Sequence, residues 1–346
     1  MDPVKKSGTT ITEVARVAGV SVSTVSRTIN GTAFVAEDKR QAVNRALQEL
    51  GFQPNYLAKS LITGRSMTVG VIAEDIVSPY YADVIRGFEH GLFDTPYQPV
   101  LQSGHWSQQR ESGAIETLIY RKVDALVLLG STLPGEELLD IAGRVPLVVF
   151  GRHVPELDAR CLTLDQYQGA YLATRHLIEL GHRDIAHLRG PDGQQDAEER
   201  LRGYQAALRD NDLPSPPELV VQGDFLEQAA YQGTLRLLGN GCPFTAIFAA
   251  NDQMAVGARL ALYRQGLRVP DDVSLVGFDD LPGSAFTTPP LTTVHQPTYQ
   301  IGRALAAHTL GLLQGEMPTL PDFPLTLSIR ESTRSLRRTA ARRPAL

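Results

Sequence analysis

The sequence predicts an N-terminal all-α helix-turn-helix domain with a hinge helix, followed by an α/β core of two doubly wound lobes. Three observations predict this division. Two short helical patterns joined by a glycine-containing turn occur near the N-terminus. After residue 66, β-branched runs alternate with helical stretches over about 280 residues, which is typical of parallel sheets. The first 65 residues are basic, with nine Lys or Arg against five Asp or Glu, although the whole chain carries a net charge of −5.

The composition is that of an ordinary globular protein, with 42% hydrophobic and 21% charged residues among 346. Because no run of about 18 apolar residues and no export signal is present, we expect a cytoplasmic protein without a membrane partner. Cys161 and Cys242 lie far apart without metal-type spacing, so we expect no metal and a reducing compartment. The basic head suits a module that faces phosphates. A solvated surface of uneven charge explains the same counts, so the charge alone does not decide.

The first helix is predicted to begin at a capping box. Thr10 and Glu13 have the T-x-x-E spacing in which the threonine side chain accepts from the Glu13 amide. Val14, Ala15 and Ala18 follow at helical spacing. Gly19 then permits a left-handed turn and ends the helix.

A second short helix is predicted to begin after Ser21 and to bury Val25 and Ile29. Two short helices joined by a tight turn form the helix-turn-helix motif, whose second helix enters the major groove of DNA. We expect base contacts from Val22, Ser23 and Arg27, and phosphate contacts from Thr24, Ser26 and Asn30. The alternative for each residue is a solvated helix face.

Residues 11–31, ITEVARVAGVSVSTVSRTING, closely resemble the DNA-binding signature of the lactose/galactose repressor (LacI/GalR) family. The resemblance implies a sequence-specific DNA-binding transcriptional regulator, expected to be a repressor, that binds a pseudo-palindromic operator as a homodimer. It also implies no enzymatic activity, no catalytic residue and no cofactor.

A third helix, with Val43, Ala46, Leu47 and Leu50 on one side, is expected to end at Gly51. The segment that follows resembles the hinge helix of the same family, over about 54–62. The resemblance implies minor-groove contacts from four residues of this helix: Asn55, Ala58, Lys59 and Leu61. Leu61 is expected to insert between base pairs, which kinks the duplex; the alternative is packing against its partner helix alone. Lys59 stands where the family usually has Arg, so the charge is kept without the planar guanidinium.

Nine strands are expected in the body, over 69–72, 100–102, 125–129, 147–150, 161–164, 185–188, 219–221, 246–249 and 274–278. Helical spacing fills the gaps, for example over 80–93, 169–180, 198–209 and 253–265. About 280 residues are too many for one such core, so two lobes are expected.

Segments of the body also resemble the family, including Gly181 to Ile185, Asn251 to Gly257 and Pro270 to Asp279. The resemblance implies a periplasmic-binding-protein-like core that the chain crosses three times. We expect a DNA-binding domain over 1–65, a two-lobed effector-binding and dimerisation domain over 66–330, and a basic, disordered tail over 331–346. The first lobe would comprise about 66–165 and 295–325, and the second about 166–294.

An effector cleft is expected at the carboxyl ends of the strands. The resemblance implies that Arg200, Asn251, Asp279 and Gln296 line it, and their donors and acceptors suit sugar hydroxyls. Three aromatic side chains, Tyr80, Tyr81 and Phe225, are suited to the apolar face of a ring. The expected site also includes Arg152, where the chain departs from the family. Two loop residues, Gln194 and Asp196, complete it.

These effector residues also have structural interpretations. Asn251 is equally suited to capping the next helix, Asp279 to a turn, and Arg200 to pairing with Glu198 or Glu199 at the surface. Tyr80 and Tyr81 are equally suited to core packing. Where relatives place Asp, this chain has Arg152, which favours a sugar phosphate over a neutral sugar.

The motifs of common enzyme classes, such as G-x-S-x-G and H-E-x-x-H, are missing from the sequence. The alternatives are a regulator that senses a nucleobase or nucleoside, and a solute-binding protein without a regulatory function. We favour a sugar or sugar phosphate that changes lobe closure and thereby operator affinity.

Overall fold

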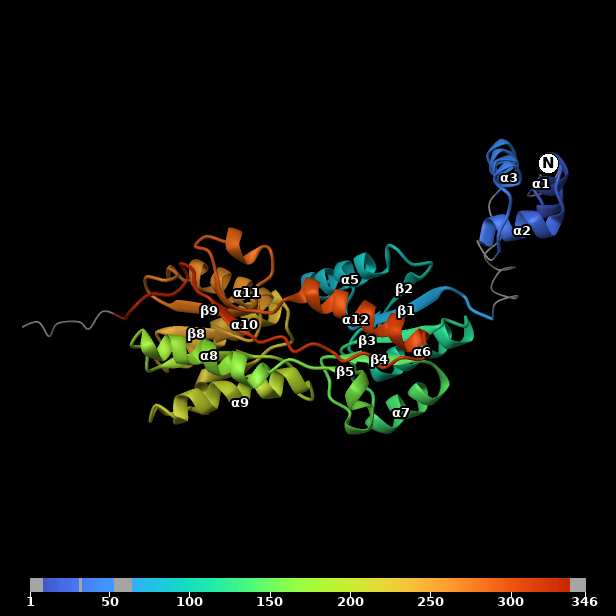
Figure 1. Cartoon of the computed structure of the whole chain (residues 1–346). Coiled ribbons are helices and arrows are strands. Elements are labelled where there is room, and N and C mark those ends of the chain that lie inside the picture. The colour runs from blue at the N-terminus through green and yellow to red at the C-terminus, as the bar shows by residue number, and fades with distance from the viewer. Residues whose placement is uncertain (1–8, 31–32, 53–63, 337–346) are drawn as a thin grey trace, which may run out of the picture. The chain divides into compact units, whose positions relative to one another are not determined.

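The computed structural model describes residues 9–30, 33–52 and 64–336, and the chain forms two compact units that divide between Ser66 and Met67 (Figure 1). The predicted hinge helix lies outside the described residues, and with it Asn55, Ala58, Lys59 and Leu61.

The first unit consists of α1 (Ile11–Ala18), α2 (Val22–Asn30) and α3 (Glu37–Glu49). Thr10 caps α1 by accepting from the Glu13 amide at 3.3 Å, and Gly19 ends the helix at a φ of 65°. One small core joins the three helices, formed by Val14, Ala15, Val25, Val43 and Ala46. The predicted helical N-terminal fold is therefore confirmed.

The second unit begins with a five-stranded parallel sheet in the order β2-β1-β3-β4-β5. Its strands are β1 (Thr68–Ala73), β2 (Gln98–Ser103), β3 (Ala125–Leu129), β4 (Leu147–Phe150) and β5 (Cys161–Leu162). Side chains alternate between the two faces of β1. Val71 packs in one cluster with α5 (Pro79–Leu92) and α12 (Thr298–Leu313), while Ile72 packs in another with α6 (Gln108–Tyr120) and α7 (Gly135–Arg144).

The second lobe contains a six-stranded sheet in the order β11-β10-β9-β8-β6-β7, parallel except for the antiparallel pair β10 and β11. Its strands are β6 (Ile185–Arg189), β7 (Val220–Gln222), β8 (Ala246–Ala249), β9 (Ser274–Asp279), β10 (Thr292–His295) and β11 (Thr326–Ser328). The lobe also contains α8 (Gln166–Glu179), α9 (Gln195–Arg209), α10 (Glu227–Gly239) and α11 (Asp252–Arg264). Short 3₁₀ turns occur at Pro155–Arg160, Pro217–Leu219 and Ser284–Phe286.

The chain passes between the lobes three times. It leaves the first sheet after β5, returns from β10 into α12, and enters the second sheet again as β11. On its return, α12 packs closely against α5 at two glycines: a Cβ on Gly302 would lie 2.0 Å from the Val84 carbonyl oxygen, and one on Gly87 would lie 2.1 Å from that of Tyr299. The first lobe therefore depends on a helix from late in the sequence.

Two strands, β10 and β11, were not among the nine expected. Both are short, and β10 contains two consecutive threonines instead of an apolar run. Thr292 and Thr293 are nevertheless fully buried, because their hydroxyl groups pair with Thr333 at 3.2 Å and with Asp252 at 2.5 Å. Because these polar residues are buried with hydrogen-bond partners, β10 lacks the apolar pattern from which a buried strand is predicted.

The expectation of a disordered tail from residue 331 is wrong for residues 331–336. The hydroxyl group of the buried Ser332 donates to the Leu275 carbonyl at 2.5 Å, and the backbone carbonyl of Ser332 accepts from the Leu275 amide at 2.8 Å. The Leu336 amide donates to the Leu180 carbonyl at 2.8 Å. These long-range bonds order a segment whose Ser, Thr and Arg composition suggests disorder. Within 9–30, 33–52 and 64–336, no helix is both long and apolar enough to span a bilayer.

Candidate functional site

The exposed face of α2 carries the predicted base-contacting residues. Val22, Ser23 and Arg27 are all exposed, whereas Thr24 and Ser26 are partly buried. The Ser21 hydroxyl group accepts from the Thr24 amide at 3.2 Å and lies 2.9 Å from the hydroxyl groups of Ser23 and Thr24. The side chain of Asn30 lies outside the described residues.

Two basic residues beside α2 were not singled out from the sequence. Arg16 and Lys39 line a shallow hollow with Gly19 and Ser21, next to the start of α2. Arg16 comes from α1 and Lys39 from α3, so only the folded unit brings them together. The hollow therefore places two cations beside the N-terminal end of the predicted recognition helix, where phosphate groups are favoured.

Arg200 of α9 and Asp279 at the end of β9 form a buried pair within the second lobe. The Arg200 Nη1 atom lies 3.8 Å from Asp279 Oδ1 and donates to the Ala250 carbonyl at 2.6 Å, and its Nε donates to Gln166 at 2.9 Å. The guanidinium carbon lies 3.9 Å from the centroid of the Phe278 ring. The alternative that Arg200 pairs with Glu198 or Glu199 at the surface is therefore wrong, because Arg200 is buried.

The polar network continues into the first lobe. Asp279 Oδ1 accepts from Gln296 Nε2 at 2.7 Å, and Gln296 Oε1 accepts from the Tyr80 hydroxyl group at 3.0 Å. Burial raises the pKa of Asp279 above its ordinary value, and Arg200 opposes this shift. Three of the four residues implied by the family resemblance are therefore joined to one another and to Tyr80.

Asn251 has a structural role in this conformation. Its Oδ1 accepts from the Met254 amide at 2.8 Å and so caps α11, while its Nδ2 donates to the Phe225 carbonyl at 3.0 Å. Asn251 thus holds Phe225 in place while it also lines the cleft.

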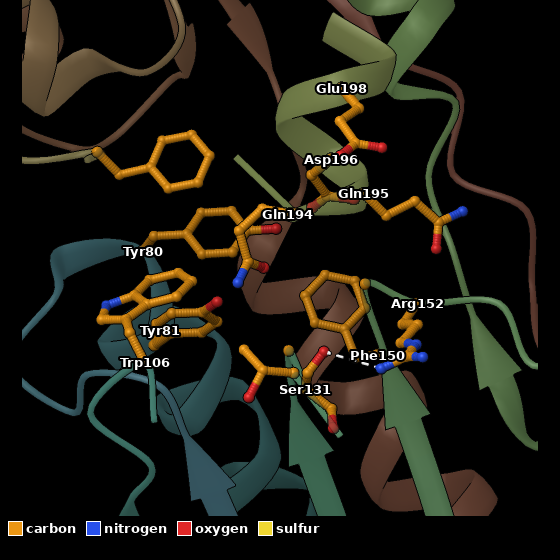
Figure 2. A pocket seen from close by; sticks show the side chains of 15 residues that line it. Tyr80, Tyr81, Trp106, Ser131, Phe150, Arg152, Gln194, Gln195, Asp196 and Glu198 are labelled. Atoms are coloured by element: carbon orange, nitrogen blue, oxygen red, sulfur yellow. Dashed lines mark hydrogen bonds between the residues drawn. The ribbon is translucent and has the colours of Figure 1, made fainter. Parts of the chain in front are cut away.

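The open cavity of about 250 Å³ lies beside this network (Figure 2). Six of the predicted effector residues line it: Tyr80, Tyr81, Arg152, Gln194, Asp196 and Phe225. Much of its wall is completed by five residues that were not among the predicted effector residues: Trp106, Ser131, Thr132, Gln195 and Glu198. Loops after β2 and β3 bring in the first three, and a local motif could not have identified them.

Arg152 turns toward the backbone. Its Nη1 donates to the Ser131 carbonyl at 3.3 Å and to the Leu133 carbonyl, and Figure 2 shows the bond to Ser131. Two acidic residues, Asp196 and Glu198, line the same cavity. Burial raises the pKa of Asp196 to about 6, although Arg200 lowers it.

Aromatic rings from both lobes meet at the cleft. Trp106 from the first lobe and Phe225 from the second have ring centroids 6.1 Å apart, tilted by 40°. Tyr80 and Tyr81 contact each other edge to face at 5.3 Å, and Tyr80 stacks on Phe150 at 6.4 Å. The two tyrosines therefore take part in aromatic packing and also line the cavity.

Comparisons with known proteins agree with both units. Residues 10–55 match the family model of bacterial regulatory proteins, lacI family, and residues 174–333 match that of a periplasmic binding protein-like domain. The HTH-type transcriptional regulator GalR of Salmonella typhimurium is 38% identical over 311 residues, which are 90% of this chain and 91% of that protein. The ribose operon repressor of Escherichia coli is 37% identical over 295 residues, covering 85% and 89%. The crystal structure of the Lac repressor dimer bound to operator and the anti-inducer ONPF has a TM-score of 0.85 at 28% identity, covering 94% of this chain and 99% of that chain.

Proposed function

This chain belongs to the LacI family of bacterial regulatory proteins, and from that membership we propose that it controls transcription in response to a neutral sugar bound between its lobes. It is a DNA-binding transcriptional regulator with a periplasmic-binding-protein-like core.

The composition of the cavity wall carries the proposal of a neutral sugar. Hydroxyl, amide and carboxyl side chains from Ser131, Thr132, Gln194 and Asp196 face a space of about 250 Å³, bordered by aromatic rings. Polar side chains together with aromatic rings suit a sugar, which carries hydroxyl groups around a ring whose faces are partly apolar.

The charges at the cavity favour a neutral ligand over a sugar phosphate. Arg152 is the cation for which an anionic group was considered, but its Nη1 donates to two backbone carbonyls. The carboxylates of Asp196 and Glu198 line the same space and repel an anion. A nucleobase would use the aromatic rings equally well, but it would leave more of these hydroxyl and carboxyl groups without partners.

We propose that two copies of the chain bind a pseudo-palindromic operator, each through one α2. Arg27 supports base recognition, because it is exposed and its guanidinium matches guanine. For the dimer, α5 and α11 lie along the same side of the second unit (Figure 1). A groove there is lined by residues of both helices and of the 281–287 segment, and α11 exposes Val256 and Tyr263 beside it. A second copy would cover these apolar side chains.

The coupling between effector and DNA would pass through contacts between the lobes. The Tyr80 bond to Gln296 and the bond from Ser78 to Gln253 at 3.4 Å both join α5 to residues outside the first sheet. An effector that contacts Tyr80 and Asp196 together would favour one closure of the lobes, and its differential affinity sets how far operator binding changes.

The experiment is a thermal-shift screen of the full-length protein against neutral sugars, their phosphates and nucleobases. A ligand that binds only the folded state raises the melting temperature by mass action. Hits are then measured by calorimetry and by gel shift on operator fragments selected from a random DNA library.

We expect a neutral sugar to bind more tightly than its phosphate and to change operator affinity at least about 5-fold, the lower range of allosteric coupling. Tighter binding of a sugar phosphate or of a nucleobase would contradict the proposed effector while leaving the regulator class intact. Binding without any change in operator affinity would contradict the coupling.

A further inference from the structure

Two buried carboxyl groups lie directly behind the effector cavity. Glu74 follows the last residue of β1 and is 1% exposed, and Glu111 in the first turn of α6 is fully buried. A Cβ on Gly104 would lie 3.0 Å from Glu74 Oε2 and 3.5 Å from the Cβ of Glu111, so the two acids flank the same glycine.

Each acid uses one oxygen to hold a segment that lines the cavity. Glu74 Oε2 accepts from the Trp106 amide at 2.7 Å. Glu111 Oε2 accepts from both the amide and the hydroxyl group of Thr132, at 2.9 Å each. The shape of the cavity wall at Trp106 and Thr132 therefore depends on these two carboxyl groups.

The other oxygen of each acid has no donor. Glu74 Oε1 and Glu111 Oε1 are buried without a hydrogen-bond partner in the described part of the chain. Ionising a buried carboxylate in this state carries a desolvation cost, and a second buried carboxylate near it adds a repulsion.

We propose that Glu74 holds a proton near neutral pH, and that this proton keeps the Trp106 and Thr132 segments in place at the effector cavity. A protonated carboxyl group supplies an O–H donor and removes the repulsion between Glu74 and Glu111. Glu74 and Glu111 would then be positioning residues, which act on a ligand only through Trp106 and Thr132.

The surroundings of Glu74 agree with this assignment. Burial and, next, the charge of Glu111 raise the pKa of Glu74 to about 7, while the bond from the Trp106 amide lowers it. Tyr81 on α5 also feels the charge of Glu74. Two further ionisable side chains are neighbours in sequence, Asp75 after Glu74 and His105 before Trp106.

The backbone at Trp106 explains why loss of the proton would be felt there. His105 and Trp106 both have positive φ, 54° and 55°, a region that L residues rarely adopt. The turn wraps around Glu74: the His105 amide donates to the Glu74 carbonyl at 2.8 Å, and the Trp106 amide donates to its carboxyl group. When rising pH ionises Glu74, repulsion from Glu111 displaces it and releases this turn.

Trp106 is the only tryptophan in the chain, so intrinsic fluorescence reports on this turn alone. The experiment measures emission of the full-length, ligand-free protein between about pH 5 and 9, which brackets the ordinary ionisation of Glu and His. We expect one transition with a midpoint of about 7. Because no effector is present, the outcome does not depend on whether the effector is a sugar.

Variants assign the transition to a residue. Glu74→Gln stays neutral and keeps an acceptor for the Trp106 amide, so its emission should remain constant across the range. Glu111→Gln removes the repulsion and should lower the midpoint. His105→Gln should keep the transition. Glu116→Gln should keep it too, because it changes an exposed carboxylate on α6, the helix that contains Glu111.

A transition that persists in Glu74→Gln, or that disappears in His105→Gln, would overturn the proposal. If Glu74→Gln does not fold, carbon-13 NMR of the side-chain carboxyl groups in the unmodified protein decides. One glutamate should then titrate at about 7, and ordinary titration of all glutamates at about 4.3 would reject the proton on Glu74.

Discussion

The guanidinium group of Arg200 and the carboxyl group of Asp279 lie 3.8 Å apart, and each side chain is only 5% exposed. Asp279 is also bonded to Gln296, and Gln296 to Tyr80 of the first lobe. A change at this pair is therefore transmitted to both walls of the effector cleft.

Asp279→Ala should lower the free energy of unfolding by about 3–5 kcal/mol, because it leaves the Arg200 charge buried without its anion. Urea unfolding of the second unit measures the loss. Arg200→Met together with Asp279→Leu should recover much of it, since neither charge then remains. A double variant no more stable than Asp279→Ala would contradict the ion-pair interpretation.

Gly302→Ala should destabilise the protein by about 1–3 kcal/mol through overpacking. The added Cβ would lie 2.0 Å from the Val84 carbonyl oxygen, where α12 crosses α5. Gly113→Ala is the matched control, because that glycine is exposed in α6 with no atom within 4 Å of the new Cβ. It should stabilise by about 0.5–1 kcal/mol. Equal effects of the two substitutions on the urea midpoint would argue against close packing at Gly302.

Arg27→Ala should reduce the preference for operator over unrelated DNA by about 1–3 kcal/mol at one base pair, because a guanidinium that pairs with guanine reads sequence. Gel shifts on operator variants with single base changes measure the preference. Arg45→Ala, an exposed arginine on α3, is the control and should weaken binding to both DNAs alike. Parallel losses for Arg27→Ala would place that residue with the phosphate contacts.

Phe286→Glu should convert the proposed dimer to a monomer, since it introduces a charge beside the groove between α5 and α11. Phe286 is 87% exposed, which is unusual for so large an apolar side chain. Tyr120→Glu alters a side chain that is 88% exposed at the end of α6 and should leave the mass unchanged. Light scattering after size exclusion distinguishes the two. A dimer that persists in Phe286→Glu would show that Phe286 lies outside the interface.

Effector affinity should fall as the pH drops below about 6, where Asp196 takes up a proton and loses part of its capacity to accept from hydroxyl groups of the proposed sugar. The sign for folding is opposite. The pKa of Asp196 is raised on folding from 3.8 to about 6, so the folded state holds its proton longer and stability falls as the pH rises through this interval. Asn at position 196 should flatten both profiles. Calorimetry and urea unfolding at several pH values test this, and an unchanged binding profile in Asp196→Asn would exclude the residue from recognition.

Features that depend on contiguous residues could be predicted from the sequence. Thr10 and Gly19 bound α1 because capping and left-handed turns depend on local residue types, and the strand and helix alternation followed from hydrophobic periodicity. The helix-turn-helix motif likewise lies within 21 consecutive residues, 11–31.

Features made by distant residues could not be predicted. Trp106 and Thr132 reach the cavity from separate loops, and their positions depend on the buried acids behind them. The sequence places Asn251 either in the cleft or at the cap of the next helix, whereas its bond to the Phe225 carbonyl requires the folded loop. Residues 331–336 looked like a polar tail because their partners, such as Leu275, lie more than 50 residues away.

The late position of β11 and of residues 331–336 also bears on how the protein is made. During synthesis the first unit is complete after about 66 residues. The second lobe acquires its last strand, β11, and the bond from Ser332 to the Leu275 carbonyl only near the end of the chain. The first lobe likewise waits for α12. Domains generally fold in order of emergence from the ribosome. Nascent chains therefore carry a folded DNA-binding unit before the effector-binding unit is complete. Premature termination yields DNA-binding units that no effector can control.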